Sequence, residues 1–252
     1  MSQKIAIITG GSRGLGRDMA LNLAKDGVNI IFSYHSNLIK ANEVIEAIEA
    51  LGQKAVAFQF DANNYKSGQD FIVKTTNYLQ QEYGTPNFDF LINNAGTGAY
   101  NLVSDTTEVQ FDEMMNVHLK SVYFFTQAAL PYLNEGGRIV NISSGLARFS
   151  FPGMSAYAMM KGGVEVFTRY LAKELGQRKI TANVIAPGAI ATDFAGGTNR
   201  DNEEKRAIIS NITALGRVGE TEDIGGIIAF LCSEKAGWIN GQRIEVSGGM
   251  LV

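Results

Sequence analysis

Short apolar runs alternate with amphipathic segments along the whole chain. The runs are rich in Val, Ile and Phe and end at glycine, proline or polar residues, which is typical of strands buried on both faces. They predict strands over residues 4–9, 28–34, 54–61, 88–96, 137–144, 180–188 and 243–249.

The segments between these runs carry apolar residues at helical spacing, for example Leu15, Met19 and Leu23. They predict helices over residues 14–27, 38–52, 65–84, 104–133, 155–176, 201–216 and 220–234, with a break near Pro131. In the second of these helices, one buried face is expected to hold Ile39, Val44, Ile45, Ile48 and Leu51.

Strands that alternate with helices form βαβ units, which build a parallel sheet with helices on both faces. The sequence therefore predicts an α/β fold, a doubly wound parallel sheet that spans residues 1–252 as one domain. The polar, glycine-rich stretch at 192–202 is the longest interruption. Together with the segment up to residue 216, it predicts a mobile loop over a substrate site.

Composition narrows the class of protein. The formal net charge is −3 and no basic run occurs, so no nucleic acid partner is expected. The two histidines and the single cysteine form no metal-ligand pattern, and Cys232 is expected to be a small buried hydrophobe. No apolar stretch reaches about 18 residues, so no membrane span is expected. The apolar run near the N-terminus is too short for a signal peptide, and we expect a cytoplasmic protein.

The first glycine-rich turn, "ITGGSRGLG", joins a predicted strand to a predicted helix. Helix N-termini offer unpaired N–H groups that bind anions, and glycines let the backbone approach a pyrophosphate. Gly10, Gly14 and Gly16 therefore favour a dinucleotide site, although their spacing is not GxGxxG. The alternative is a tight turn with no ligand.

The end of the second predicted strand bears on the choice of cofactor. An acidic residue there holds the ribose 2′-OH of NAD, but this chain has "FSYHSN" and no carboxylate. Arg13 is available nearby, and guanidinium is a preferred partner of phosphate. We expect Arg13, with the hydroxyls of Tyr34 and Ser36, to bind the 2′-phosphate of NADP. The alternative is a solvated arginine at a turn.

Tyr157 and Lys161 share one face of a predicted helix because they are four residues apart. A neighbouring ammonium lowers the pKa of a phenol and makes it a better acid–base catalyst. Ser144 ends a predicted strand at the same sheet edge, where its hydroxyl can hold a carbonyl oxygen, whereas Ser143 is expected to point elsewhere. The alternative is a pair of surface residues that meet by chance.

Taken together, these motifs resemble the short-chain dehydrogenase/reductase superfamily, in its compact single-domain form with a Rossmann-type fold. The resemblance covers nearly the whole chain, in the order and at the spacings typical of the family. Its elements are Thr9, Gly10, Gly14, Gly16, Asp61, Asn93–Gly96, Asn116, Ser144, Tyr157, Lys161, Pro187, Gly188, Ile190 and Thr192.

The resemblance implies a catalytic set. Ser144 would polarise the substrate carbonyl, and Tyr157 would be the acid in reduction and the base in oxidation. Lys161 would lower the pKa of Tyr157 and bind the nicotinamide ribose. Asn116 would hold a water that links Lys161 to solvent, or else would satisfy backbone groups at an irregular helix turn.

The resemblance also implies an NADP(H) site. Asp61 and Ala62 would contact adenine, or Asp61 would only cap a turn. Ile190 and Thr192 would reach the nicotinamide carboxamide. The implied cofactor-binding set is Gly10, Ser12, Arg13, Gly14, Leu15, Gly16, Tyr34, Ser36, Asp61, Ala62, Asn93, Ala95, Gly96, Tyr157, Lys161, Pro187, Gly188, Ile190 and Thr192.

Some residues depart from the family pattern or bear on the substrate. Met159 and Met160 replace smaller residues and are expected to be core packing, and Ser247 replaces an aspartate. Three apolar residues near Ser144 and Tyr157 would wall an apolar pocket or pack against another subunit. They are Phe149, Phe151 and Met154.

The expected activity is NADPH-dependent reduction of a ketone, in a protein similar to 3-oxoacyl-carrier-protein reductases. An acidic carrier protein would need a basic patch, with Lys120, Arg148, Arg169 and Arg178 as candidates. The alternative is a non-catalytic dinucleotide-binding sensor or scaffold. The resemblance further implies a homotetramer formed through the helices at 104–133 and 155–176, whose apolar surface could instead be wholly intramolecular.

Overall fold

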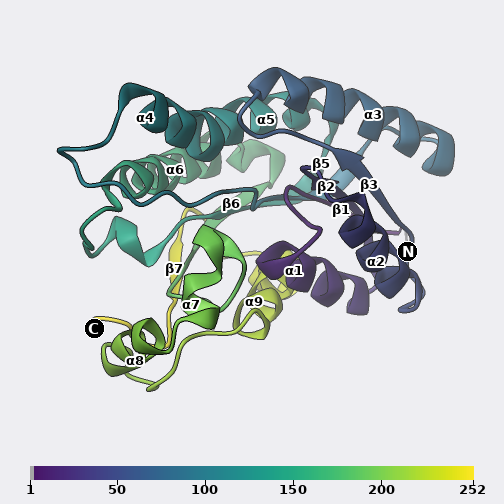
Figure 1. The fold of residues 1–252 in the computed structure, drawn as a ribbon. Helices are drawn as coiled ribbons and strands as arrows, with labels where there is room; N and C mark the ends of the chain where they lie inside the picture. The colour runs from purple at the N-terminus through teal and green to yellow at the C-terminus, as the bar shows by residue number, and fades with distance from the viewer. Residues whose placement is uncertain (1–2) are drawn as a thin grey trace.

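A parallel sheet of seven strands forms the centre of residues 3–252, the part of the chain that the computed structural model describes. Its strand order is β3-β2-β1-β4-β5-β6-β7 (Figure 1). The strands are β1 (Ile5–Ile8), β2 (Asn29–Tyr34), β3 (Ala55–Gln59), β4 (Phe88–Asn93), β5 (Leu133–Ile142), β6 (Thr181–Pro187) and β7 (Arg243–Val246). The order reverses between β1 and β4, and in such sheets ligands bind at the carboxyl ends beside that point.

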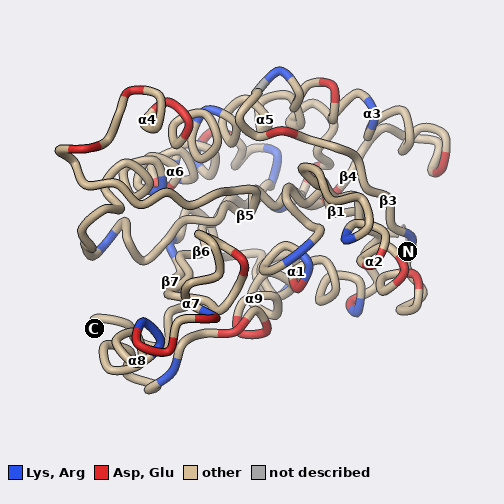
Figure 2. The backbone as a smooth tube through the Cα atoms, in the orientation of Figure 1, with Lys and Arg blue, Asp and Glu red and all other residues tan. Residues whose placement is uncertain are grey.

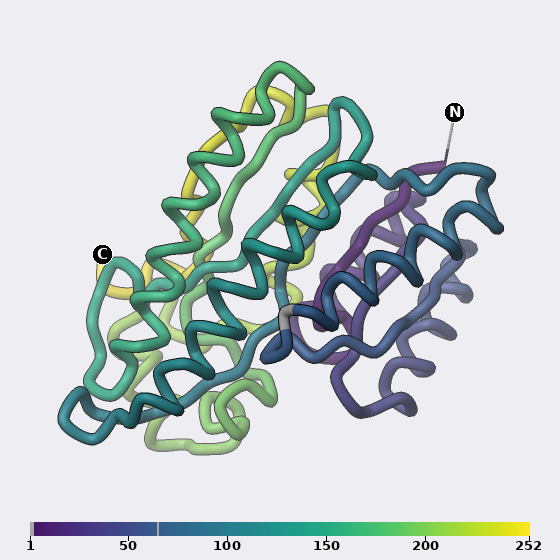
Figure 3. Tube along the Cα trace, turned by 90° about the horizontal axis from the view of Figure 1, so that it is seen from above, coloured from purple at the N-terminus to yellow at the C-terminus, as the bar shows by residue number. Residues whose placement is uncertain are grey.

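Helices cover both faces of the sheet (Figures 1 and 3). One face is covered by α1 (Gly14–Lys25), α2 (Leu38–Glu49) and α9 (Glu222–Cys232), which bury one apolar cluster. The other is covered by α3 (Tyr65–Tyr83), α5 (Ser121–Ala129) and α6 (Ser155–Glu174), which run side by side and bury further clusters. The predicted doubly wound α/β fold is therefore confirmed.

Shorter elements complete the chain. The helix α4 (Glu108–Met115) continues through a π-helical turn, Asn116–Lys120, into α5. After β6 the chain forms α7 (Thr198–Asp201) and α8 (Glu203–Asn211), in the segment predicted to be a mobile loop. None of the helices within residues 3–252 has both the length and the apolar character needed to cross a bilayer.

The first turn of the fold is tightly packed. A methyl group on Gly16 would overlap the carbonyl oxygen of Gly10 and would lie 2.6 Å from Asn94 Nδ2. A methyl group on Gly11 would lie 2.6 Å from Phe32 Cβ in β2. Only glycine fits at these two positions, so α1 can start directly against the ends of β1, β2 and β4.

Three details of the predicted helices are wrong. Ile39 is 74% exposed, because it lies five residues before Val44 and hence about 140° away around the helix. Leu51 is 39% exposed, because α2 ends at Glu49. The helix predicted for 201–216 ends at Asn211, and Thr213 instead forms a bridge with Met250.

Two adjacent glycines in α9 provide a test of the packing between α1 and α9. A methyl group on Gly225 would overlap Asp18 and Asn22 of α1, whereas a methyl group on Gly226 would meet nothing within 4 Å. We expect Gly225→Ala to lower the free energy of unfolding by about 1–3 kcal/mol through overpacking. Gly226→Ala should raise it by about 0.5–1 kcal/mol, because alanine is the better helix former. Urea denaturation measures both, and equal changes would contradict this packing.

Candidate active site

The turn between β1 and α1 lies over the end of β2. Gly10 and Gly14 have φ values of 70° and 53°, which favour glycine. The N–H of Gly10 donates to Ser33 Oγ at 2.8 Å, and that of Gly11 donates to the Ser33 carbonyl at 2.9 Å. The first N–H groups of α1 are thereby presented at the carboxyl edge of the sheet, where they can bind an anion.

Asn94 ties this turn to the end of β4. Its Nδ2 donates to the carbonyls of Thr9 at 2.9 Å and Gly10 at 3.1 Å. In return Thr9 Oγ1 accepts from the N–H groups of Asn94 and Ala95. The prediction gave Asn94 no role of its own. The sequence feature that could have indicated this role is an amide side chain directly after a strand, beside the turn that contains Gly10.

The side chain of Asn93 points away from the site edge, so a contact of Asn93 with a cofactor would be made by its main chain. Asn93 is 3% exposed, and its Nδ2 donates to Thr126 Oγ1 at 2.9 Å and Asn141 Oδ1 at 2.8 Å. Successive residues of a strand point to opposite faces, so Asn93 enters the layer below the sheet and Asn94 remains at the edge. Ala95 and Gly96 follow at that edge, with Ala95 Cα 3.0 Å from a methyl group on Gly10.

A cavity of about 600 Å³ lies beside the glycine turn, at the start of α1 and the end of β2. Arg13 and Ser36 line it as predicted, but Tyr34 does not, because its ring is packed against the apolar core. The lining residues are Ser12, Arg13, Gly14, Arg17, His35, Ser36, Asn37, Lys40, Glu43 and Asp193.

The charges of this cavity are partly paired. Arg13 is 70% exposed at its side chain, and its Nη1 lies 3.7 Å from Asp193 Oδ2. Asp193 also accepts from Arg200. Lys40 Nζ donates to Glu43 at 2.8 Å. Arg13 is therefore accessible to an anionic ligand, which would compete with Asp193 for it.

Two further segments reach the same edge. Asp61 Oδ1 accepts from the N–H of Asn63 at 2.9 Å, which is a turn-capping role, and Ala62 is half-buried. After β6, Thr192 lies beside the glycine turn. A methyl group added at Gly14 would lie 3.6 Å from Thr192 Cγ2. Ile190 is 8% exposed and forms a bridge with Gly219.

The segment between β6 and Thr192 is held close to the C-terminal turn. The N–H of Gly188, directly after Pro187, donates to the Val246 carbonyl, and a methyl group on Gly188 would lie 2.9 Å from Ser247 Cα. Ser247 Oγ donates to Glu245 at 3.1 Å and accepts from the N–H of Met250. Ser247, which replaces an aspartate of the family pattern, thus supports this turn through both hydrogen bonds.

Ser144, Tyr157 and Lys161 are brought together. Tyr157, near the start of α6, is 8% exposed and hydrogen-bonded to Ser144. Lys161 Nζ lies 5.6 Å from the centroid of the Tyr157 ring and donates to the Ile142 carbonyl at 2.7 Å. Ser143 points away, as predicted, and donates to Glu165 at 2.7 Å.

Burial shifts both titratable groups of this set. It raises the pKa of Tyr157 to about 12, and the hydrogen bond with Ser144 opposes that rise. It lowers the pKa of Lys161 to about 8. The expected lowering of the phenol pKa by Lys161 is thus not the dominant effect here. The ammonium is directed at the Ile142 carbonyl, and loss of water stabilises the neutral phenol.

Asn116 begins the π-helical turn, where its carbonyl accepts from the N–H of Ser121 five residues later. A helix irregularity was one of the two predicted settings for this residue. Single π-helical turns inside α-helices are frequent at functional sites. The π-helical turn packs against α6, and within it His118 lies next to Tyr157.

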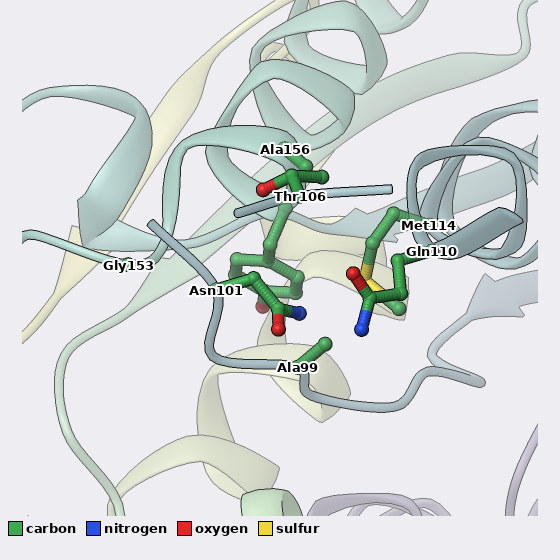
Figure 4. Close-up of a pocket in the computed structure, with 8 residues that line it drawn as sticks. Ala99, Asn101, Thr106, Gln110, Met114, Gly153 and Ala156 are labelled. Carbon is green, nitrogen blue, oxygen red and sulfur yellow. The ribbon is translucent and has the colours of Figure 1, made fainter. Parts of the chain in front are cut away.

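A pocket borders Tyr157 on its other side (Figure 4). It encloses only about 10 Å³, which is room for about one water molecule. Figure 4 shows the side chains of Asn101, Gln110 and Met114 extending toward Ala99. The lining residues are Ala99, Asn101, Thr106, Gln110, Met114, Gly153, Ala156 and Tyr157.

Apolar side chains surround the Tyr157 ring. Met160 is 4% exposed and Met154 packs in the same cluster, whereas Met159 is 61% exposed, so its prediction as core is wrong. Phe149 and Phe151 pack on each other at a centroid distance of 5.9 Å. The centroid of the Phe194 ring lies 5.8 Å from that of Tyr157, so the loop after Thr192 reaches the predicted catalytic set.

Three of the four candidate basic residues, Arg148, Arg169 and Arg178, lie apart from one another. Arg148 forms an ion pair with Glu245, and Arg178 forms one with Glu135 at the amino end of β5. Arg169 Nη1 donates to the Glu165 carbonyl on α6. Basic and acidic residues alternate over the surface elements (Figure 2).

Comparisons with known proteins agree with the fold and motifs. A family model described as enoyl-(acyl carrier protein) reductase matches residues 10–251. An uncharacterised oxidoreductase of Methylorubrum extorquens is 36% identical, covering 98% of this chain and 97% of that protein. The short-chain dehydrogenase/reductase FrzI of a Cladobotryum species is 38% identical, covering 98% and 96%. The structure of the angucycline C-6 ketoreductase LanV with bound NADP has a TM-score of 0.94 at 35% identity, covering 98% and 95%.

The lowered pKa of Lys161 predicts a pH-dependent stability. Between about pH 8 and its unfolded pKa near 10.5, the unfolded chain holds a proton that the folded chain has lost, so the wild type gains stability as pH rises. In Lys161→Met this contribution is absent. We expect the stability of the variant relative to wild type to fall between pH 8 and pH 10, as measured by urea denaturation. A constant difference would contradict burial of the ammonium.

Proposed function

The chain belongs to the short-chain dehydrogenase/reductase superfamily, and from this premise we propose that it is an NADPH-dependent reductase of a ketone carbonyl. Its oxidoreductase relatives and the ketoreductase LanV support this assignment. The observation that carries it is the buried Tyr157, hydrogen-bonded to Ser144 and next to Lys161, at the sheet edge that also holds the glycine turn.

The protonation states favour reduction. With a pKa of about 12, Tyr157 is protonated at neutral pH and can donate a proton to an oxygen that gains negative charge. Ser144 would hold the same oxygen by a second hydrogen bond. Lys161 would bind the nicotinamide ribose, and Asn116 would link it to solvent through water. The cofactor supplies the hydride when bound.

The residues at the first turn fit a dinucleotide. Glycine at positions 10 and 16 lets the turn pack closely against Asn94 and Ala95, and the start of α1 presents its N–H groups at this edge. Arg13 and Ser36 line the adjoining cavity, and no carboxylate follows β2 directly. These features support NADP over NAD, and LanV was solved with NADP. The proposed cofactor-binding set keeps the predicted residues except the side chains of Asn93 and Tyr34.

A carrier-protein substrate is not favoured, because Arg148, Arg169 and Arg178, three of the four candidate basic residues, do not form a patch. The apolar and aromatic surroundings of Tyr157 instead support a free, largely apolar ketone. A homotetramer is also proposed. Its support is the apolar surface that α5 and α6 expose at Tyr123, Phe124, Val166 and Tyr170.

Tyr157→Phe separates a reductase from a non-catalytic sensor. We expect kcat with NADPH and a reducible ketone to fall by about 10²–10⁴-fold, because the proton donor is lost. The dissociation constant for NADPH should stay within a factor of two or so. The control is Tyr170→Phe, since Tyr170 lies on the same helix and is 62% exposed. Unchanged turnover in Tyr157→Phe would refute the assigned role.

Arg13→Ala tests the choice of cofactor. A hydrogen bond between charged groups contributes about 1.5–3 kcal/mol, so kcat/KM for NADPH should fall by about ten- to a hundredfold. The value for NADH should change little. Asp193→Asn should raise kcat/KM for NADPH, because the Asp193 carboxylate competes with the 2′-phosphate for the Arg13 guanidinium. The control is Lys25→Ala, at the far end of α1. Equal losses with both cofactors would show that Arg13 does not read the 2′-phosphate.

A further inference from the structure

His118 is a fully buried imidazole in the π-helical turn, and it contacts the catalytic tyrosine. Its ring stands nearly perpendicular to that of Tyr157, at 85° with 4.9 Å between the centroids. On another side, a methyl group on Gly96 would lie 2.9 Å from His118 Cε1. The imidazole therefore fills the space between Tyr157 and the chain that leaves β4.

The hydrogen bonding of His118 defines its tautomer. Nε2 lies 2.7 Å from the Thr97 carbonyl oxygen and 3.4 Å from the Thr97 amide nitrogen. The carbonyl oxygen is the closer of the two and can only accept, so we assign the proton to Nε2. Nδ1 is then a bare acceptor, and it has no partner within residues 3–252. Burial and the positive charge of Lys161 lower the pKa of His118 to about 3. The ring is therefore neutral at neutral pH, where the phenol of Tyr157 is protonated.

The bond to Thr97 fixes one wall of the pocket beside Tyr157. Ala99 and Asn101 of that wall follow Thr97 within four residues, and the N–H of Asn101 donates to the Gly153 carbonyl at 3.0 Å. Both residues line the pocket together with Tyr157, and Figure 4 shows Ala99 and Asn101 next to each other. The same imidazole thus contacts the proton donor and the segment that borders it.

We propose that His118 is a positioning residue for the reaction assigned to this site. Its ring holds the phenol of Tyr157 in place, and its Nε2–H holds the segment 97–101 that forms the pocket wall. The kinetic part of this proposal rests on the proposed reductase function. The part that concerns the hydrogen bond from His118 to Thr97 rests on the geometry alone.

Two substitutions separate the two contacts, because histidine combines a ring with an N–H donor. His118→Phe keeps a ring beside Tyr157 and removes the donor to Thr97. His118→Gln keeps an N–H donor and removes the ring. If His118 had a purely structural role, both variants would show the same pattern of change in kcat and KM. The size of that change would follow the loss of stability in each variant.

In His118→Phe, we expect KM for the ketone to rise about tenfold, the value of one hydrogen bond, with little change in kcat. Hydrogen–deuterium exchange of the 97–101 amides should accelerate by a similar factor. In His118→Gln, we expect kcat to fall about tenfold while KM and the exchange of these amides stay near wild type. The alkaline limb of its kcat–pH profile should move to lower pH, because water that reaches the phenol lowers its pKa.

The same defect in both variants, or no defect in either, would overturn the proposal. Should neither variant fold, Gly96→Ala tests the position of the His118 ring while His118 itself is kept. The added methyl group would lie 2.9 Å from His118 Cε1, so the ring must move. An unchanged kcat in Gly96→Ala would then count against His118. Amide exchange needs no substrate, so it remains decisive if the protein reduces no ketone at all. Equal exchange of the 97–101 amides in wild type and His118→Phe would refute the tether.

Discussion

The close approach of α1 to the ends of β1, β2 and β4 is the constraint on which the rest of the site depends. It needs the absence of a side chain at Gly16 and Gly11, and it is held by Asn94, which bonds both Thr9 and Gly10. With α1 so placed, its N–H groups, the cavity beside Arg13 and the chain near Thr192 meet at one edge. A bulkier turn would move α1 away from the sheet and separate these groups.

Burial determines the protonation of Tyr157 and Lys161, which lie at the same sheet edge. Removal from water stabilises the neutral form of both titratable groups, so the pKa of Tyr157 rises and that of Lys161 falls. The protein keeps a desolvated ammonium there with a main-chain carbonyl as its partner. Such an arrangement costs stability near neutral pH, which is common where a site must hold a proton donor ready.

Much of the fold could be predicted from the sequence. The alternation of apolar runs and amphipathic segments indicated the parallel sheet, and the motifs located Ser144, Tyr157, Lys161 and the glycine turn. Errors arose where the prediction depended on the direction in which a side chain points rather than on the residue type. Ile39 was placed on the wrong side of α2, and the prediction did not distinguish the opposite directions of the Asn93 and Asn94 side chains. The pairing of Arg13 with Asp193 joins residues far apart in the chain, and no local pattern indicates it.

The central claim is that the cavity beside the first turn is a site for a 2′-phosphorylated dinucleotide. Isothermal titration of the wild-type protein with NADPH and with NADH, each at low and high salt, tests it most directly. We predict that NADPH binds more tightly by about tenfold or more, as one charged contact provides, and that salt narrows this advantage by screening Arg13. Equal affinities for the two cofactors, or a ratio that does not change with salt, would contradict the account.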